Sequence, residues 1–289
     1  MATSRTPLII IAVALALGAG LAWRYQVPSS SPAPVAEPIP SQPALTGTTH
    51  TATTAASSNL FHQFGSLKQR AQAGDAVAQR QIAELYHACL NVNGKVDAFL
   101  ELHSGSPFPP GKGPEDLMET LAQARVKDCA QIDGGTQIPW EQVRIWYGKA
   151  ASNGDLAARI RELFFDHRNG PSLDAEQAER LIEEVIASQD PAAVYAYGDT
   201  MEGRLTENLP APWQPLVEGR EAGRAWRLAA CRMGYDCGPN SLMYANLCLH
   251  ALTCGVGTYE EVLRSGFISE EARAKIEPQL DLVMSTLHP

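Results

Sequence analysis

Hydrophobic residues recur at helical spacing through most of the chain that follows Asn59. Five stretches place apolar side chains at i, i+3, i+4 and i+7, which is the pattern of one buried helical face. No stretch alternates apolar and polar residues for long enough to predict a strand. We therefore predict an all-α body over residues 59–289. The five stretches are Leu67 to Ala73, Val77 to Leu90, Glu115 to Val126, Trp140 to Ala151, and Leu173 to Ala187.

Short polar breaks separate the predicted helices. A glycine just past a helix can take the left-handed conformation, and an aspartate after it can cap the first amides of the next helix. Proline at the first helical position and a Thr/Glu capping box serve the same purpose. We expect a tight turn between helices at each break: Gly74-Asp75, Gly154-Asp155, Asp190-Pro191, Gly234-Tyr235-Asp236, and Thr258 with Glu261.

The turns recur with similar neighbours. The segment LKQRAQAGDAVAQRQIAELY (residues 67–86) aligns with WYGKAASNGDLAARIRELFF (residues 146–165), and the next turn follows Asp155 by 35 residues at Asp190. A period of 35 residues with two helices per unit is typical of an α-solenoid. The series is interrupted, because residues 91–139 match no unit.

The segment WYGKAASNGDLAA, which begins at Trp146, resembles the Sel1-like repeat, a relative of the tetratricopeptide repeat with the pattern W-Y-x-K-A-A-x-x-G-D-x-x-A. The match is partial at residues 67–86 and 181–202 and faint at 226–254. The resemblance implies a short α-solenoid of Sel1-like helix pairs over residues 59–289, with an insertion around 91–139.

The N-terminus predicts export. Residues 7–23 carry no charge and lie between Arg5 and Arg24, a length at the lower limit for a transmembrane helix. We expect a signal anchor over residues 1–26, with cleavage near Ala22 as the alternative. Residues 27–58 contain 24 Pro, Ser, Thr or Ala residues among 32, which predicts a disordered linker.

Composition narrows the function. The chain of 289 residues is 45% hydrophobic and 19% charged, with a net charge of −9. Removing Arg5, Arg24 and Glu37 of residues 1–58 leaves 21 basic and 31 acidic residues, a net charge of −10. An acidic body lacks the basic surface that nucleic acids or anionic lipids require, so we expect no nucleic-acid partner.

Six cysteines all follow residue 58: Cys89, Cys129, Cys231, Cys237, Cys248 and Cys254. An even number in an exported domain predicts disulfides rather than free thiols, and no C-x2-4-C pair is present for a zinc site. Cys231 ends a predicted helix and Cys237 lies in the turn before the next, so a bridge would link two paired helices, similar to those of cysteine-rich Sel1 relatives.

The remaining pairings stay open. Cys248 could bond Cys254 if the helix ends before Cys254, because six positions along a helix separate two residues by about 9 Å. The rival arrangement pairs Cys231 with Cys248 and Cys237 with Cys254. Cys89 would pair with Cys129 and tie down the insertion.

Catalytic signatures are missing from the sequence, including G-x-S-x-G, H-E-x-x-H and the Walker loop, so we predict no catalytic, cofactor-binding or metal-binding residue. His87 is expected to be a structural residue. Carboxylates on one helix and Glu141 leave a hydrolase acting on the cell wall as an alternative; those on the helix are Glu176, Glu179, Glu183 and Glu184.

Three aromatic residues are candidates for partner binding. Trp213 lies in a Pro-rich loop between helices, and Tyr195 and Tyr197 follow the turn at Asp190. Together these features predict a non-enzymatic binding or scaffold protein of the bacterial cell envelope. It would be a single-pass inner-membrane protein whose helical domain in the periplasm binds a protein partner. A periplasmic immunity protein that neutralises a secreted toxin is a narrower alternative.

Overall fold

The computed structural model describes residues 60–104, 117–167, 171–201, 205–219, 221–251, 255, 257–264 and 268–288. These residues form helices and no strand, which confirms the predicted all-α class. The predicted anchor (1–26) and linker (27–58) lie outside the described residues. None of the described helices is long and apolar enough to span a bilayer.

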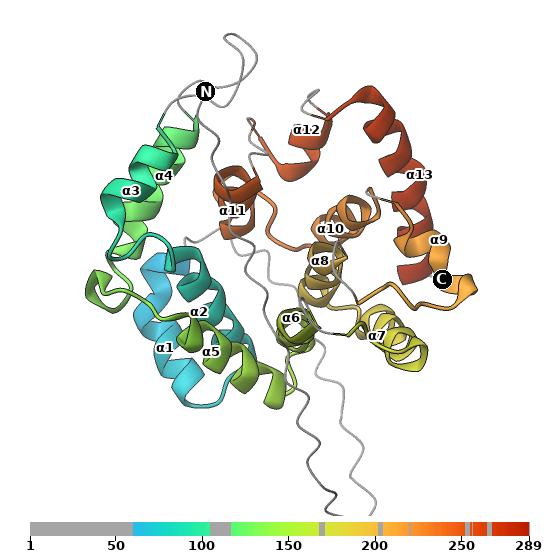
Figure 1. Ribbon diagram of the computed structural model, residues 1–289, viewed down its shortest axis with the longest axis horizontal. Coiled ribbons are helices and arrows are strands. Elements are labelled where there is room, and N and C mark those ends of the chain that lie inside the picture. The colour runs from blue at the N-terminus through green and yellow to red at the C-terminus, as the bar shows by residue number, and fades with distance from the viewer. Residues whose placement is uncertain are drawn as a thin grey trace, which may run out of the picture. The chain divides into compact units, whose positions relative to one another are not determined.

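The helices begin and end close to the boundaries that the hydrophobic periodicity predicts (Figure 1). In chain order they are η1 (Leu60–Gln63), α1 (Phe64–Gln72), α2 (Ala76–Cys89), α3 (Val96–Leu102), α4 (Leu117–Cys129), η2 (Asp133–Gly135), α5 (Trp140–Ser152), α6 (Leu156–His167), α7 (Ala175–Ser188), α8 (Pro191–Thr200), η3 (Ala211–Trp213), α9 (Gln214–Val217), α10 (Ala222–Arg232), α11 (Leu242–Ala251), α12 (Tyr259–Arg264) and α13 (Glu270–Leu287).

The two Gly-Asp turns have the predicted geometry. Gly74 and Gly154 lie in the left-handed region, with φ of +96° and +92°. Asp75 then caps α2 by accepting a hydrogen bond from Ala78 N at 3.0 Å, and Asp155 caps α6 in the same way. Each turn reverses the chain, so that α1 packs on α2 and α5 packs on α6.

The other predicted turns also form. Asp190 caps α8 by accepting from Ala192 N at 2.9 Å, with Pro191 as the first helical residue. Thr258 and Glu261 exchange hydrogen bonds at the start of α12, which is a capping box. Gly234 has a φ of +102° and ends α10. Helix termination in this chain is therefore fixed by local sequence.

The helices stack in an ordered series in which α2 contacts α5, α5 contacts α6, α6 contacts α8, α8 contacts α10, and α10 contacts α13. Figure 1 shows α6 between α5 and α8. Helices α3 and α4 fall within the predicted insertion at 91–139, and α4 contacts both α2 and α11. The insertion thus connects the beginning of the series with α11, far along the sequence.

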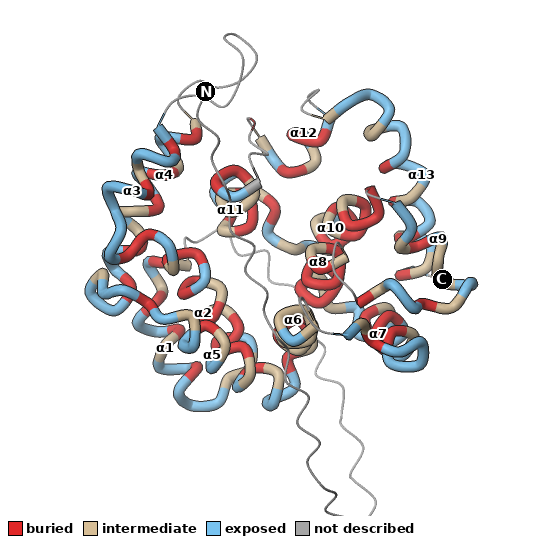
Figure 2. The backbone as a smooth tube through the Cα atoms, in the orientation of Figure 1, coloured by how far each residue is buried: buried red, intermediate tan, exposed pale blue. Residues whose placement is uncertain are grey.

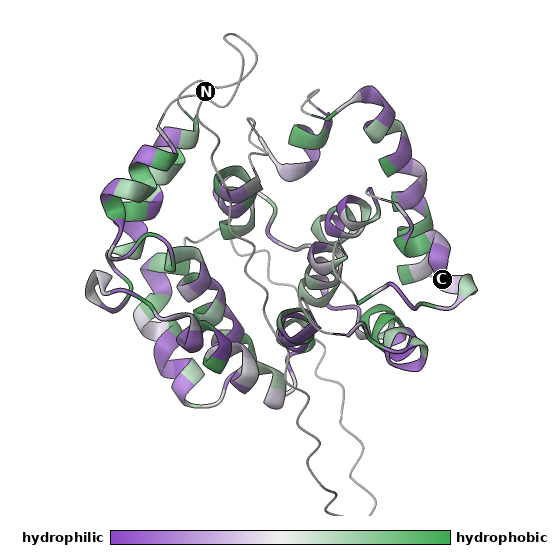
Figure 3. Cartoon of the chain, in the orientation of Figure 1, coloured by the Kyte–Doolittle hydropathy of each residue, from purple (hydrophilic) through white to green (hydrophobic). Residues whose placement is uncertain are grey.

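Two hydrophobic clusters make up the core. One is built on α1, α2, α4 and α5, and the other on α7, α8, α10 and α13. Figure 2 shows α8 and α10 buried over most of their length, whereas Figure 3 shows polar residues on every helix, as an amphipathic pattern requires. Helices α6 and α11 contribute side chains to both clusters: Ile160 and Ala158 from α6, and Met243 and Leu249 from α11.

The tightest contact within the second cluster is between α8 and α10. Both helices have a glycine at their crossing, Gly198 and Gly223. A Cβ on Gly198 would lie 2.7 Å from Trp226 Cβ and 3.0 Å from the Gly223 carbonyl oxygen, and a Cβ on Gly223 would lie 2.7 Å from the Gly198 oxygen. The absence of side chains lets the backbones touch, and Trp226 becomes fully buried beside them.

Two of the predicted disulfides are formed, Cys89–Cys129 and Cys231–Cys237. The first ties the end of α2 to the end of α4, and the second closes the turn after α10. Cys248 is also disulfide-bonded, whereas Cys254 lies outside the described residues. The Cys231–Cys237 bond excludes the rival arrangement in which Cys231 pairs with Cys248.

We expect Gly198→Ala to destabilise the protein by about 1–3 kcal/mol, because the added methyl group meets backbone atoms that cannot move aside cheaply. Gly65→Ala is the matched control. Gly65 lies in α1 with nothing within 4 Å of its added Cβ, so this change should stabilise by about 0.5–1 kcal/mol. Urea unfolding measures both. Equal effects of the two variants would contradict the proposed close approach.

The two disulfides should contribute unequally to stability. Their bonded residues lie 40 and 6 positions apart, so the loop-entropy model gives about 4 kcal/mol for Cys89–Cys129 and about 2 kcal/mol for Cys231–Cys237. Replacing each pair by alanines and measuring urea unfolding tests the ranking. An intact mass that does not change on reduction would show that the bonds are absent.

Candidate functional site

A partly open cavity of about 760 Å³ is lined by α2, α5, α6, α8 and α11. It lies where the two hydrophobic clusters adjoin, and residues of η1 and of the turn after α10 complete its wall. Helix α2 presents one face to it, with lining residues at positions 80, 84, 87 and 88, and Asn91 of the turn after α2 extends this wall. The helical positions span about 12 Å at 1.5 Å per residue.

Arg80 anchors the wall that α2 forms. Its guanidinium group donates to Asp155 Oδ2 at 3.0 Å and to Glu84 Oε1 at 2.8 Å. Burial alone would lower the pKa of Arg80, but the carboxylates of Glu84 and Asp155 raise it well above its ordinary value. The same Asp155 carboxylate caps α6, so this ion pair connects α2 with the turn that begins α6.

The opposite wall holds a second compensated cluster. The Asp199 carboxylate of α8 lies 2.6 Å from Arg161 of α6 and 3.0 Å from Arg227 of α10. Burial alone would raise the pKa of Asp199, but the two guanidinium groups lower it below its ordinary value. Arg227 also donates to the Tyr259 hydroxyl at 3.3 Å. These charges fix three helices to one another and remain ionised at neutral pH.

Tyrosines supply the aromatic part of the lining. Tyr195 of α8 stacks on Tyr235, with ring centroids 4.4 Å apart and planes inclined by 11°, and Tyr147 of α5 also faces the cavity. Burial raises the pKa of all three phenols, so they stay protonated and can donate hydrogen bonds. The cavity therefore offers flat apolar surfaces beside fixed polar groups, as binding sites do.

Two histidines line the same cavity. His87 of α2 stands edge-on to Trp140 and Phe165, and His250 belongs to α11. Burial among protein atoms, followed by the positive charge of Arg161, lowers the pKa of His87 to about 4, although water in the cavity reaches the ring. Burial and the charge of Arg125 lower the pKa of His250. Both rings are neutral at pH 7.

The aromatic residues singled out in the sequence have different positions. Tyr195 lines the cavity, as described. Tyr197 is buried against Trp226, with ring centroids 5.0 Å apart. Trp213 forms the end of η3 and donates from Nε1 to Glu179 at 2.9 Å, which ties the Pro-rich loop to α7. We therefore retain only Tyr195 in the candidate site.

The carboxylates that suggested a hydrolase lie apart from the cavity. Glu176 and Glu184 are exposed on α7 and pair with Arg180 and Arg159. Among the described residues, no group of three His, Cys, Asp or Glu side chains is arranged to hold a metal ion.

The sequence analysis expected His87 to be a structural residue and did not single out Arg161, Asp199 or Tyr235. All four residues line the cavity. The available signal was the spacing of polar residues along α2, where Arg80, Glu84 and His87 share one helical face.

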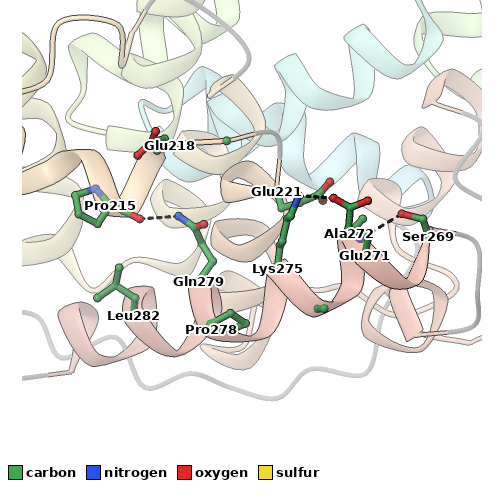
Figure 4. A pocket seen from close by; sticks show the side chains of 12 residues that line it. Pro215, Glu218, Glu221, Ser269, Glu271, Ala272, Lys275, Pro278, Gln279 and Leu282 are labelled. Carbon is green, nitrogen blue, oxygen red and sulfur yellow. Dashed lines mark hydrogen bonds and ion pairs between the residues drawn. The ribbon is translucent and has the colours of Figure 1, made fainter.

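A second groove lies between α9 and α13 and has a volume of about 640 Å³ (Figure 4). Several of its polar groups satisfy one another: Gln279 Nε2 donates to the Pro215 carbonyl at 2.7 Å, and Lys275 pairs with Glu271 at 2.7 Å. The buried Glu221 pairs with Arg224 at 2.5 Å. Because these groups already have partners, we take the larger of the two cavities as the candidate site.

No protein-family model, curated protein or solved structure matches the chain.

We expect the stability of the protein to fall as the pH decreases from about 6.5, the ordinary pKa of histidine, toward 4, the pKa of folded His87. In this window the unfolded state binds more protons, so acid favours unfolding and the stabilisation is fully present only above pH 6.5. Because water reaches the ring, we expect an effect of about 1 kcal/mol. Urea unfolding of His87→Gln should show a flatter pH dependence; an unchanged slope would contradict the assignment.

Proposed function

We propose that this chain is a non-enzymatic protein-binding or scaffold protein of the bacterial cell envelope, and that the cavity receives a segment of its partner. The observation that carries the proposal is the cavity itself, about 760 Å³ in volume and lined by side chains from α2, α5, α6, α8 and α11. The charges of Arg80 and Asp199, which line it, are already neutralised by ion pairs within the protein. A preformed surface lowers the entropy lost on binding.

The repeated architecture supports this proposal. We infer that the stacked helices are a short α-solenoid of Sel1-like helix pairs, in which α1 with α2 and α5 with α6 are the units nearest the sequence pattern. Their turns at Gly74-Asp75 and Gly154-Asp155 share the same capping geometry. Solenoids bind other proteins through surfaces to which several repeats contribute, and the cavity wall includes residues from both units.

Location in the envelope is supported by the cysteines and by the apolar N-terminal segment. Disulfides persist in oxidising compartments such as the periplasm, and the chain forms Cys89–Cys129 and Cys231–Cys237. The uncharged residues 7–23 would anchor it in the inner membrane, or be removed near Ala22. The net charge of −10 after residue 58 favours a partner with a basic surface, as in the narrower hypothesis of an immunity protein.

Site-specific photocrosslinking in intact cells tests this proposal. A photoreactive amino acid replaces Gln81, which lines the cavity, or Glu183, which lies exposed on α7 as the matched control. We expect the full-length chain to give a discrete protein adduct from position 81 and none from position 183. Equal adducts from both positions, or none from position 81, would count against partner binding in the cavity.

Once the crosslinked partner is identified, its affinity is measured for two variants of this protein. Gln81→Trp fills part of the cavity and should weaken binding of the identified partner at least tenfold, about 1.4 kcal/mol. Glu183→Trp adds the same side chain to the exposed face of α7 and should leave the affinity unchanged. A partner that binds both variants equally would not occupy the cavity.

A further inference from the structure

Arg125 is a buried cation that forms no salt bridge with a described carboxylate. The charge of Asp128 and the Phe61 ring, whose centroid lies 5.6 Å from the guanidinium carbon, compensate its burial only in part. Arg125 belongs to α4 and is 3% exposed. Its Nη1 donates to the Ala88 carbonyl at 3.2 Å and to Asn246 Oδ1 at 2.9 Å, while its buried Nη2 has no hydrogen-bond partner. None of the ion pairs among the described residues includes it. Burial lowers the pKa of Arg125 to about 10, so it remains charged at neutral pH.

This arrangement differs from that of three other arginines that are buried or half-buried. Arg80, Arg161 and Arg227 each contact a carboxylate within 3.0 Å. A buried charge without an opposite charge is unfavourable, because the protein does not replace the hydration that it has lost. A cation that is compensated only in part therefore lies behind Ala88 and Asn246, which line the cavity, and an anion from outside could neutralise it.

Asn246 lies between Arg125 and the cavity. A guanidinium group can only donate, so the amide oxygen of Asn246 must face Arg125, and its Nδ2 group keeps its two donors. Asn246 lines the cavity, together with His87, Ala88 and His250. Its Nδ2 makes no hydrogen bond within the described part of the chain. Donors therefore face the cavity in front of a buried cation.

The pKa values of His87 and His250 are lowered by the same positive charges. After burial, Arg125 and His103 are the charges that lower the pKa of His250. Around His87, Arg161, His250 and Arg125 lower the pKa, and Asp199 opposes them. A neutral imidazole can donate one hydrogen bond, and an anion nearby would favour its protonated form. The two rings can therefore both contact an anion and respond to it.

We propose that the end of the cavity bounded by Asn246, His250 and His87, with Arg125 behind it, binds an oxyanion. The group is a carboxylate or a phosphate, held by the Asn246 amide and imidazole N–H donors and stabilised by the guanidinium charge. This inference rests on the proposed function insofar as the bound partner supplies the oxyanion. The partner would place a carboxylate or a phosphate at this end of the cavity.

The test uses the full chain and two small probes, sodium phosphate and sodium acetate, each compared with sodium chloride at the same ionic strength. NMR of the imidazole rings follows the pKa values of His87 and His250. We expect at least one probe to raise the pKa of His250 by about one unit, a tenfold change in proton affinity. A response to acetate alone identifies a carboxylate site, and a response to phosphate alone identifies a phosphate site.

Asn246→Asp is the decisive variant, because its carboxylate would occupy the place of the anion beside Arg125. We expect the probe response to disappear and Tm to rise by about 2–4 °C. Gln69→Glu is the matched control, since it adds the same charge to an exposed position of α1 that does not line the cavity and should retain the response. His250→Gln, an exposed position, should weaken probe binding roughly tenfold if Asn246→Asp does not fold.

No probe response beyond that of chloride, or an equal response in Asn246→Asp, would overturn the oxyanion site. Failure of this inference is distinguishable from failure of the proposed function. A partner crosslinked from position 81 with no oxyanion effect would disprove only the subsite. An oxyanion effect without any crosslinked protein would support the subsite and disprove protein binding.

Discussion

The ion pair between Arg80 and Asp155 connects the two helical hairpins on which the rest of the fold is built. Asp155 accepts from Arg80 of α2 and also caps α6, so one carboxylate fixes the start of one helix and its position against another. Its side chain is almost fully buried, and losing one partner of such a pair costs about 3–5 kcal/mol. The register of α2 against the second hairpin sets the wall of the cavity.

The cavity exists because two hydrophobic clusters meet along polar faces. Its lining consists of charges that are compensated from within, such as Asp199 between Arg161 and Arg227, beside stacked tyrosines. Arg125 departs from this rule, because its guanidinium donates hydrogen bonds only to neutral oxygens and the charge of Asp128 offsets its burial only in part. We place the oxyanion subsite beside Arg125 because the other charges of the cavity already have ion-pair partners within the protein.

The disulfides lie next to the cavity wall. Cys89 follows the lining residue Ala88, Cys237 follows Asp236, and Cys248 follows Leu247. Each bond therefore restrains a segment that contributes to the cavity. A site restrained in this way loses less conformational entropy on binding. The same bonds would thus also hold the site in shape.

The sequence by itself determined the local structure: the helical periodicity, the left-handed Gly74 and Gly154, and the caps at Asp75 and Asp155. These features depend on neighbouring residues, so patterns reveal them. The sequence left the cysteine pairings open, and the structure decided that Cys89 bonds Cys129. Only the tertiary structure decided that His87 faces a cavity, that Tyr197 is buried while Tyr195 lines the site, and that Gly198 meets Gly223. Those outcomes depend on which helices pack together over long sequence separations, and single-helix patterns carry no information about that.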